Sequence, residues 1–558
     1  MLRNLLIAAI FKAIFIPVQF EDTALTCSIE QLNAYVGTAQ EYFNAQFKGI
    51  TEFQFGISPV VSLGNTLAFY GANGETEHDY NIRSAVEAAC RAADPYVDFA
   101  EYDNDSKGCV DCVVLFCAGL SEADGAGDDY IWPQQGHMKD RGPIPLVLDE
   151  KIIDAYLIVC ELKSDMGENA RQSGIGDFCH EFGHILGLPD LYDTDMEAGG
   201  GLAKGVWNTS LMSEGSRNDD GRCPPNMNAV EREILGTGNV MILEPGSFIL
   251  PPISQNGDYI RAESGTMGEY YLFECRSAEG WDKAIGGSGL LIYHIDKREP
   301  DYSILWDNNK VNNNPKHECA DLIEANPEAA STREIFFPQA GNSSFSSDSP
   351  TPFLFWNGSK SELALTGIHI DSEKNIRFNV IRPITMMTSD IFQDAVILGW
   401  SVDETLKNRC RYRVSWKERE SQDSEESVET GTTPCCTIER LKPGTSYVFT
   451  VKAVTDTGET FSVSSTFTTK VLMDGTHPYI NLNTSDRNPD GSFKPGAKIF
   501  LRVINARDAE EIRWYFNSIE IHADEYGKFM IRGNGTLKSV LTYADGSSDI
   551  IMKELVVE

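Results

Sequence analysis

The chain has 558 residues, and its 47 Lys and Arg against 83 Asp and Glu give a formal net charge of −36. A field of this sign repels phosphates and anionic lipid head groups, so we expect no nucleic-acid partner. With 41% apolar and 23% charged residues, the composition is that of globular domains. The length suggests a multidomain protein. No apolar run approaches the length of a membrane helix, so we expect no membrane span.

The start of the chain is a candidate export segment. Arg3 precedes the apolar run Leu5 to Phe11, and Lys12 interrupts this run before a strand-like segment, Ala13 to Phe20. No small-residue cleavage site precedes that segment. The pattern therefore favours an incomplete N-terminus over a working signal peptide.

Two kinds of pattern divide the chain at about Pro383. Before it, apolar strand-like runs alternate with helical segments such as Arg83 to Ala93, which is typical of an α+β (α/β-like) domain. After it, helical patterns stop, and short alternating strands recur about every ten residues, as in β-sandwiches. We predict one mixed domain, residues 1–382, followed by two all-β sandwich domains, residues 383–472 and 473–558.

The two predicted sandwiches differ in pattern. In the first, Trp400 and Trp416 stand in strand-like runs, and Tyr447 occupies the place of a tyrosine corner, so this sandwich resembles a fibronectin type III domain. The second, with Trp514 and the terminal alternation Leu537 to Val557, looks immunoglobulin-like. We interpret both as spacers or as modules that contact a cell surface or glycans.

The most informative segment runs from Cys179 to Asp190 and contains the pattern His-Glu-x-x-His-x-x-Gly-x-x-Asp. Residues four apart lie on one face of a helix, so His180 and His184 can each direct a ring nitrogen at one metal ion. A pattern with all five of these positions rarely arises by chance. The spacing therefore predicts a zinc site on a helix.

Three further positions complete the predicted zinc site. Glu181 projects beside the metal, where its carboxylate can take a proton from a zinc-activated water and later pass it to a leaving amine. Gly187 ends the helix, because glycine adopts the left-handed conformation without steric cost. The turn sends the chain back toward the ion, so Asp190 becomes the third ligand, and a fourth position is left for water and substrate.

The sequence alone leaves alternatives open at this site. His180 and His184 can be buried histidines of an ordinary helix, or the arrangement can be a metal site that has lost catalysis. Glu231, in the helical segment Asn226 to Leu235, is the rival third ligand. In thermolysin-like enzymes a glutamate from a later helix completes the coordination.

The extended pattern resembles the metzincins, whose zinc helix ends at a Gly and whose third ligand comes three residues later. Their Met-turn has a counterpart in Trp207-Asn-Thr-Ser-Leu-Met212, and Met212 would give the ligands a polarizable apolar floor. Many metzincins use a Tyr two residues after that Met. Here the position is Glu214, so no Tyr role carries over.

More specifically, the chain resembles the immune inhibitor A family of bacterial zinc proteases from about Lys12 to Ile381. The matching segments begin, in order, with Tyr102-Asp-Asn-Asp, Ile131-Trp-Pro, Pro189-Asp-Leu-Tyr-Asp, Gly280-Trp-Asp-Lys and Gly289-Leu-Leu-Ile-Tyr-His. The resemblance implies a metzincin-type domain in a secreted endopeptidase that uses zinc. It also implies calcium as a structural ion and accessory β-domains after the catalytic one.

A second candidate metal site is an acidic loop. Asp103, Asp105 and Asp111, with Gly108 at the sixth position, are spaced like the front of a calcium loop. Lys107 stands where the family pattern has another Asp, so a solvated acidic turn is the alternative. Weaker calcium candidates are two acidic groups, Asp124, Asp128 and Asp129, and Asp193, Asp195 and Glu197.

The main hypothesis is a zinc-dependent endopeptidase that hydrolyses peptide bonds of extracellular proteins. We expect it to be exported or surface-located, with protein or peptide substrates as its partners. The second hypothesis is a surface adhesin or binding protein whose protease-like domain holds structural metal only. Four protein ligands around the metal would support the adhesin, whereas an open fourth position in a cleft would support the protease.

Overall fold

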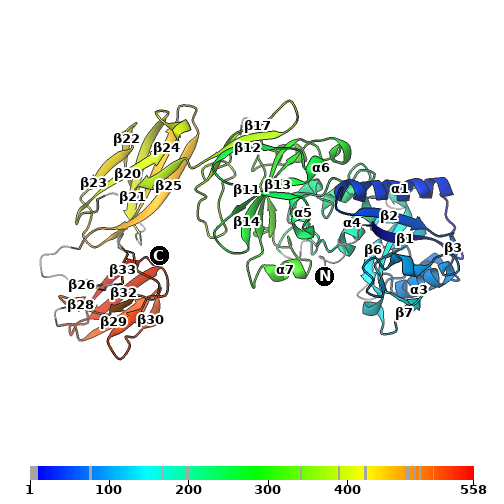
Figure 1. Ribbon diagram of the computed structural model, residues 1–558, viewed down its shortest axis with the longest axis horizontal. Helices are drawn as coiled ribbons and strands as arrows, with labels where there is room; N and C mark the ends of the chain where they lie inside the picture. The colour runs from blue at the N-terminus through cyan, green and yellow to red at the C-terminus, as the bar shows by residue number, and fades with distance from the viewer. Residues whose placement is uncertain are drawn as a thin grey trace. The chain divides into compact units, whose positions relative to one another are not determined.

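The computed structural model describes residues 10–74, 78–165, 168–196, 198, 200–339, 342–387, 390–419, 421, 424–471, 478–482, 484, 486–488, 492–506 and 508–558. The start of the candidate export segment, residues 1–9, and Glu197 of the second acidic group lie outside these ranges. The chain forms two compact units, Met1–Ile381 and Arg382–Glu558 (Figure 1). No helix within the described ranges is long and apolar enough to cross a membrane.

A mostly parallel sheet forms the first half of the N-terminal unit. Its order is β10 (Glu168–Gln172), β9 (Ala155–Asp165), β5 (Val113–Leu120), β1 (Ile10–Gln19) and β2 (Glu52–Ile57), with β3 (Val61–Ser62) beside β1 and β6 (Gln134–His137) beside β9. The pairs among β1, β2, β3, β5 and β9 are parallel, whereas β6 and β10 run antiparallel to β9.

Successive residues of the central strands face opposite sides of this sheet. Phe11 and Phe15 of β1 join one hydrophobic core with helices α1 (Ile29–Gln46) and α4 (Gly176–Ile185). Ile14 and Ile16 join a second core with α3 (Ile82–Ala93), and Figure 1 shows α1 and α3 on opposite sides of the blue strands. Because both faces are covered, β1, β5 and β9 are buried almost throughout.

Three smaller sheets complete the N-terminal unit, two in its second half and one in its first half. Their strands are β11 (Asn239–Ile242), β13 (Asp258–Glu263), β14 (Glu269–Arg276), β15 (Gly289–Asp296) and β16 (Ala320–Leu322) in one sheet, β12 (Gly246–Leu250), β18 (Ile376–Ile381) and β17 (Ala364–Ile370) in the next, and β4 (Cys109–Val110), β8 (Lys151–Ile153) and β7 (Leu146–Leu148) in the last. The remaining α-helices are α2 (Leu67–Gly71), α5 (Ala229–Leu235), α6 (Ile253–Asn256) and α7 (Ser303–Asp307).

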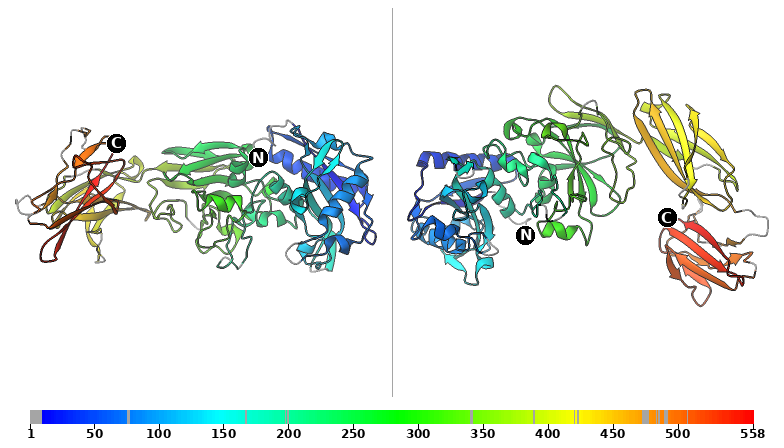
Figure 2. Two further views of the ribbon diagram at one scale, coloured as in Figure 1. Left: turned by 90° about the horizontal axis from the view of Figure 1, so that it is seen from below. Right: turned by 180° about the vertical axis from the view of Figure 1, so that it is seen from behind.

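Helix α4 belongs to a core that the two halves share. Leu272 of β14 and Tyr293 of β15 are buried in the same cluster as Phe182 of α4 and Phe11 of β1. The green strands of the second half lie beside the blue and cyan first half in the views of Figure 2. The helix that carries the motif histidines is therefore fixed by side chains from both halves of the N-terminal unit.

The C-terminal unit contains β-strands and no α-helix within the described ranges. Its sheets hold β19 (Ile384–Met387), β20 (Ala395–Val402) and β23 (Cys435–Glu439); β22 (Glu426–Gly431), β21 (Cys410–Glu418), β24 (Ser446–Thr455) and β25 (Thr460–Thr468); β26 (Tyr479–Ile480) and β28 (Val503–Ile504); β27 (Lys498–Phe500) and β31 (Lys528–Met530); and β30 (Ile519–Ile521), β29 (Glu511–Phe516), β32 (Gly535–Thr542) and β33 (Ser548–Leu555).

Two residues that suggested a fibronectin type III domain lie as expected. Trp400 is buried, and the Lys442 N–H donates to the Tyr447 hydroxyl oxygen at 2.8 Å, as a tyrosine corner requires.

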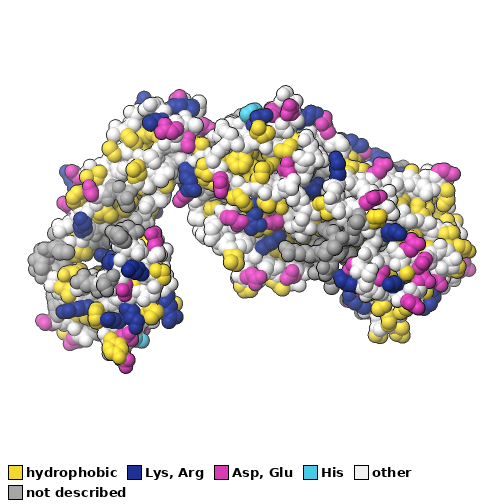
Figure 3. All heavy atoms as spheres, in the orientation of Figure 1, with side chains coloured by type: hydrophobic (Ala, Val, Ile, Leu, Met, Phe, Trp, Pro, Cys, Tyr) yellow, Lys and Arg dark blue, Asp and Glu magenta, His cyan; other side chains and the backbone are white. Residues whose placement is uncertain are grey.

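The surface carries its charges in a dispersed pattern. Figure 3 shows Asp and Glu side chains scattered among basic, hydrophobic and uncharged ones on the visible face of both units. On this face the acidic excess of the chain is thus spread over the surface and not gathered at one site. This distribution agrees with a role in solvation.

Candidate metal centre

Helix α4 has one apolar face and one polar face. Phe178, Cys179 and Phe182 are fully buried, and the Phe182 ring centroid lies 4.8 Å from that of Phe43 on α1. His180 and His184 project from another face, and 12% and 13% of their side chains are exposed. Burial of the phenylalanines therefore fixes the direction in which the two imidazoles point.

The end of α4 redirects the chain toward these histidines. Gly187 has a φ of +94°, which confirms the predicted left-handed glycine. The Leu188 N–H donates to the Gly183 carbonyl at 3.0 Å, the long bond of a Schellman motif. Three residues after the glycine, Asp190 lies almost fully buried beside the helix that it has just left.

Three side chains converge at one point. Asp190 Oδ1 lies 3.2 Å from His180 Nε2 and 3.3 Å from His184 Nε2. Within the described part of the chain, these three residues form the one group of at least three His, Cys, Asp or Glu side chains whose ligand atoms all lie within 4.8 Å of one another. The structure therefore brings together the three residues that the motif predicted.

The hydrogen bonds around the centre leave acceptor atoms facing inward. His180 Nδ1 lies 3.1 Å from the Leu211 carbonyl oxygen, and His184 Nδ1 lies 2.8 Å from that of Leu188. A carbonyl accepts, so each Nδ1 carries a proton, which leaves Nε2 as the ring nitrogen that can bind a metal. Asp190 Oδ1 is buried and has the two Nε2 atoms as its near neighbours. The two Nε2 atoms and Asp190 Oδ1 therefore form a donor set that fits a divalent cation such as zinc.

The electrostatics of the group also favour a positive charge. Burial acts to lower the pKa of His180, but the bond with Asp190 raises this pKa to about 9. Burial acts to raise the pKa of Asp190, but the two histidines hold it well below its usual range. The three groups thus stabilise a cation at their centre.

Glu181 follows the first histidine and is half-buried on the same helix. Burial raises the pKa of its carboxyl, and the nearby His180 and His184 act to lower it. A carboxyl with a raised pKa is a better proton acceptor than an ordinary surface glutamate. Its position beside the three converging groups suits proton transfer there.

Met212 packs directly against the helix that carries the histidines. A Cβ at Gly183 would lie 2.6 Å from Met212 Sδ, so the glycine admits the sulfur. The Met212 carbonyl accepts the Leu191 N–H at 2.8 Å, and Met212 itself is fully buried. The methionine therefore contacts both the helix and the loop that carries Asp190.

Glu231 does not join the three converging groups. Its Oε1 accepts from the Ser210 hydroxyl at 2.6 Å and from the Met212 N–H at 3.0 Å, and its Oε2 accepts from the Asn228 N–H at 2.7 Å. The last bond closes a capping box at the start of α5. Both carboxylate oxygens are thus engaged in holding α5 and the Met212 segment, which argues against the thermolysin-like alternative.

Sequence reasoning missed Asn309. Its side-chain Nδ2 donates to Asp190 Oδ2 at 2.6 Å, and its side-chain Oδ1 accepts the Asp190 N–H at 2.6 Å. Tyr192, which is 36% exposed, was also missed, and its ring centroid lies 6.2 Å from that of His180. The one local signal for the first residue was the asparagine-rich run Asn308 to Asn314.

The acidic loop at Asp103 is paired with lysines. Lys151 Nζ lies 2.8 Å from Asp103 Oδ2, and Lys107 pairs with Asp105. Asp111 Oδ2 accepts from the backbone and side-chain amide nitrogens of Asn104. The carboxylates of the candidate calcium loop are therefore engaged by ammonium and amide groups, which supports the turn alternative.

The weaker acidic candidates are not gathered into a cluster of ligand atoms within the described ranges. Asp193 accepts the N–H groups of Asp195 and Ala203, at 3.1 and 3.0 Å. Asp128 and Asp129 are exposed. These carboxylates thus give no geometric support to a further calcium site.

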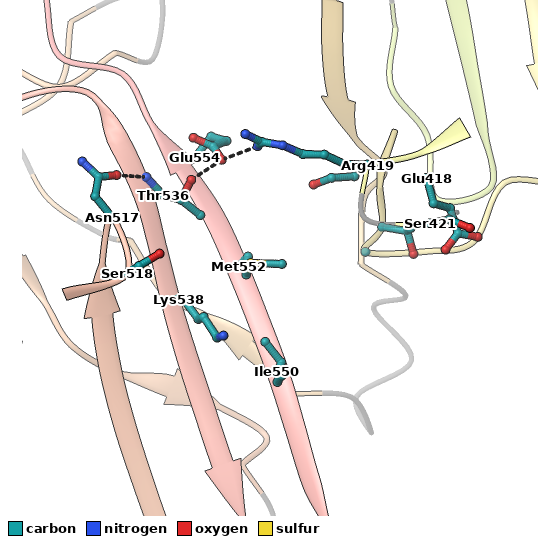
Figure 4. Close-up of a pocket in the computed structure, with 13 residues that line it drawn as sticks. Glu418, Arg419, Ser421, Asn517, Ser518, Thr536, Lys538, Ile550, Met552 and Glu554 are labelled. Carbon is teal, nitrogen blue, oxygen red and sulfur yellow. Dashed lines mark hydrogen bonds and ion pairs between the residues drawn. The ribbon is translucent and has the colours of Figure 1, made fainter. Parts of the chain in front are cut away.

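The C-terminal unit contains a polar hollow (Figure 4). Arg419 Nη1 lies 3.2 Å from Glu554 Oε1, and the Thr536 hydroxyl donates to the same oxygen. Ser518, Lys538, Ile550 and Met552 also line it. Its lining lacks histidine, so it offers no parallel to the centre on α4.

Family models assign a class to both parts of the chain. Residues 20–235 match the model described as "Immune inhibitor A peptidase M6, catalytic domain", and residues 383–470 match the fibronectin type III domain. The chain therefore carries an M6 peptidase domain followed by all-β structure that includes a fibronectin type III domain. The resemblances to the immune inhibitor A family and to the fibronectin type III domain are thus confirmed.

Individual relatives match a shorter part. Immune inhibitor A of Bacillus thuringiensis subsp. alesti is 28% identical over 203 residues, which cover 32% of this chain and 29% of that protein. Pre-pro-metalloprotease PrtV of Vibrio cholerae serotype O1 (strain M66-2) is 30% identical over 169 residues, 27% of this chain and 18% of that protein. The match thus spans less than a third of the length of either relative.

Solved structures match at a low level. One described as "Myokine structure" covers 16% of this chain and 95% of its own, at 18% identity and a TM-score of 0.15. A score this low does not establish a shared fold for the chain.

Proposed function

We propose that this protein is a zinc-dependent endopeptidase in which His180, His184 and Asp190 hold the metal and Glu181 is the general base. The observation that carries the proposal is the convergence of three possible ligand atoms within 4.8 Å of one another, next to the helix α4 that also carries Glu181. The M6 match over residues 20–235 and the metalloprotease relative support the same chemistry.

In the proposed peptide hydrolysis, each residue of the site has a separate role. A bound zinc ion supplies Lewis acidity, which activates water near neutral pH. Glu181 accepts the proton of the attacking water and returns it to the leaving amine, so that one carboxylate acts as base and then as acid. The carbonyl oxygens of Leu211 and Leu188 hold the imidazoles of His180 and His184 in the ligating tautomer.

The metzincin type is part of this proposal. The left-handed Gly187 followed by Asp190 three residues later, and a buried Met212 in contact with the zinc helix, support it. Met212 supplies a polarizable apolar surface under the ligands. The engagement of Glu231 in a capping box supports Asp190 as the third ligand.

The adhesin with a structural metal remains the second candidate function. A structural zinc site is closed by four protein ligands, whereas a catalytic site keeps one position open. The converging group contains three residues within the described ranges, which favours the enzyme. The fibronectin type III domain suits either function, as a spacer or as a contact to a cell surface or glycans.

The remaining proposals concern location and calcium. We expect an extracellular or surface location and extracellular protein substrates, because a secreted role suits a protease with accessory β-domains. The immunoglobulin-like class of the last sandwich and the domain boundaries at 382 and 472 stay predictions. Calcium at Asp103, Asp105 and Asp111 also stays a prediction, and the lysine pairs there weigh against it.

The test combines metal content with activity. The purified full chain is analysed for zinc by atomic absorption and assayed for casein cleavage beside Glu181→Ala and the exposed control Glu244→Ala. We expect zinc in all three proteins, and activity in all but Glu181→Ala. Zinc-replete wild type without peptidase activity would contradict the enzyme and support the adhesin, and an active Glu181→Ala variant would remove Glu181 from its role.

A further inference from the structure

Asp190 is held by a segment that follows it by more than a hundred residues. The Asn309 side chain makes two hydrogen bonds with Asp190, one to its N–H and one to its Oδ2, each 2.6 Å long. We call these two bonds the Asn309 bridge. They leave Asp190 Oδ1 as the oxygen that faces His180 and His184.

The bridge fixes the orientation of the Asn309 amide. The Asp190 N–H needs an acceptor and its carboxylate needs a donor, so the amide oxygen and nitrogen can satisfy both in one arrangement only. Asn309 has a φ of +56°, a left-handed conformation that Asn tolerates better than most residues. Both the side chain and the backbone thus suit an asparagine here.

Neighbouring asparagines secure the loop that follows Asp190. Asn312 Nδ2 donates to the Leu191 carbonyl at 3.0 Å, and Asn313 Oδ1 accepts from the Thr194 hydroxyl at 3.0 Å. Asn312 is fully buried and also bonds Ala320 on β16 at both its N–H and its carbonyl. The segment 309–313 therefore connects the loop after α4 to the second half of the N-terminal unit.

The segment is itself anchored to the shared core. Val311 is buried in the same cluster as Phe182 and Met212, and the Cys319 N–H donates to its carbonyl at 3.1 Å. His317, further along the chain, pairs with Asp296 at the end of β15 at 2.8 Å. The segment that carries Asn309 is therefore held in place by the shared core, which fixes the position of Asn309 next to Asp190.

We infer that Asn309 is the positioning residue of the metal centre: it aims Asp190 Oδ1 at the two histidines and thereby raises metal affinity. The inference rests on the proposed zinc site. It adds that residues beyond the M6 match, which ends at 235, complete that site. Loss of a bond that orients a metal ligand typically costs about 10- to 100-fold in metal affinity.

The test is a double-mutant cycle on zinc affinity, measured by chelator competition on the full chain. Asn309→Gly removes the amide without forcing a Cβ into the left-handed region, and the exposed neighbour gives the control Asn308→Ala. We expect Asn309→Gly to weaken zinc binding about 10- to 100-fold. In an Asp190→Ala background it should change the residual affinity by less than about twofold, because its effect passes through Asp190.

Each outcome bears on a different claim. An unchanged affinity in Asn309→Gly, or an equal loss in both backgrounds, would overturn the inference and leave the proposed zinc site intact. A wild type that binds no zinc would overturn the proposed function and the inference with it. If circular dichroism shows Asn309→Gly unfolded, Asn309→Asp repeats the cycle, since Asp also tolerates this backbone and keeps the acceptor for the Asp190 N–H. The same dependence on Asp190 is then expected, and its absence would overturn the inference.

Discussion

The carboxylate of Glu231 accepts the backbone N–H of Met212 at 3.0 Å, which joins the start of α5 to the segment under the candidate metal centre. The same carboxylate accepts from Ser210 and Asn228. A buried glutamate with three donors supports structure and has no free oxygen for a metal.

Glu231→Ala should destabilise the protein without removing zinc from the folded fraction. Three buried donors lose their acceptor, so the free energy of unfolding should fall by about 3 kcal/mol. Urea unfolding curves measure this change, with exposed Glu244→Ala as the control. A variant as stable as the parent but without zinc would instead make Glu231 the third ligand.

Removal of the metal should lower thermal stability in wild type but not in a ligand variant. Binding to the folded state alone adds about 3 kcal/mol at a hundredfold excess of free zinc over Kd. A chelator should therefore lower the melting temperature of the wild type, and added zinc should restore it. His180→Ala should lack the response, and His369→Ala, at an exposed histidine, should keep it. A response in His180→Ala would place the metal elsewhere.

Gly183→Ala should destabilise the protein although alanine favours helices. The helix propensity gain is about 1 kcal/mol, whereas the new Cβ meets Met212 Sδ at 2.6 Å in a packed core, and overpacking costs about 1 to 3 kcal/mol. Combining it with Met212→Ala should relieve the clash, so thermal melts of the four proteins should show coupling. Additive effects would mean that the methionine does not press on the helix.

Lys151→Met should destabilise the acidic loop, because Asp103, with 1% of its side chain exposed, loses its ammonium partner. Burial acts to raise the pKa of Asp103, but the bonds from Lys151 and the loop amides lower it. This contribution is present above the unfolded pKa, near 4, and is lost as the pH falls through the lower folded value. The difference in the free energy of unfolding between wild type and variant at pH 7 should therefore close in acid.

Calcium separates the two interpretations of the same loop. Because lysines pair with its carboxylates, the loop of the wild type should bind no calcium. Millimolar calcium should therefore leave the melting temperature of the wild type unchanged. A calcium-dependent stabilisation that Asp103→Asn removes would restore the predicted calcium site. Exposed Asp128→Asn provides the control for loss of one carboxylate.

Local rules account for the parts that the sequence predicted well. The spacing of His180 and His184 and the left-handed Gly187 depend on helix geometry and glycine sterics within a dozen residues. The apolar run that forms β1 was also predicted as a strand, whereas its parallel pairing and its burial on both faces were not. The capping role of Glu231 was not predicted, although Asn228 stands three residues before it, which is the spacing of a capping box.

Long-range partners account for what the sequence could not predict. Lys151 lies 48 residues from Asp103, and Asn309 lies 119 residues from Asp190. Neither spacing has a periodicity that pattern analysis detects. Only the tertiary fold decides which of many lysines and asparagines arrives at the site.

The separation between Asp190 and Asn309 sets an order of events during synthesis. At roughly 5 to 20 residues per second, a ribosome needs about 6 to 24 s to add the 119 residues between them. Throughout that interval the nascent chain already contains both motif histidines but has no partner to orient its aspartate. If zinc binds as proposed and Asn309 orients Asp190 as inferred, tight metal binding waits until the second half of the N-terminal unit has emerged, and a chain cut short before Asn309 would bind zinc weakly.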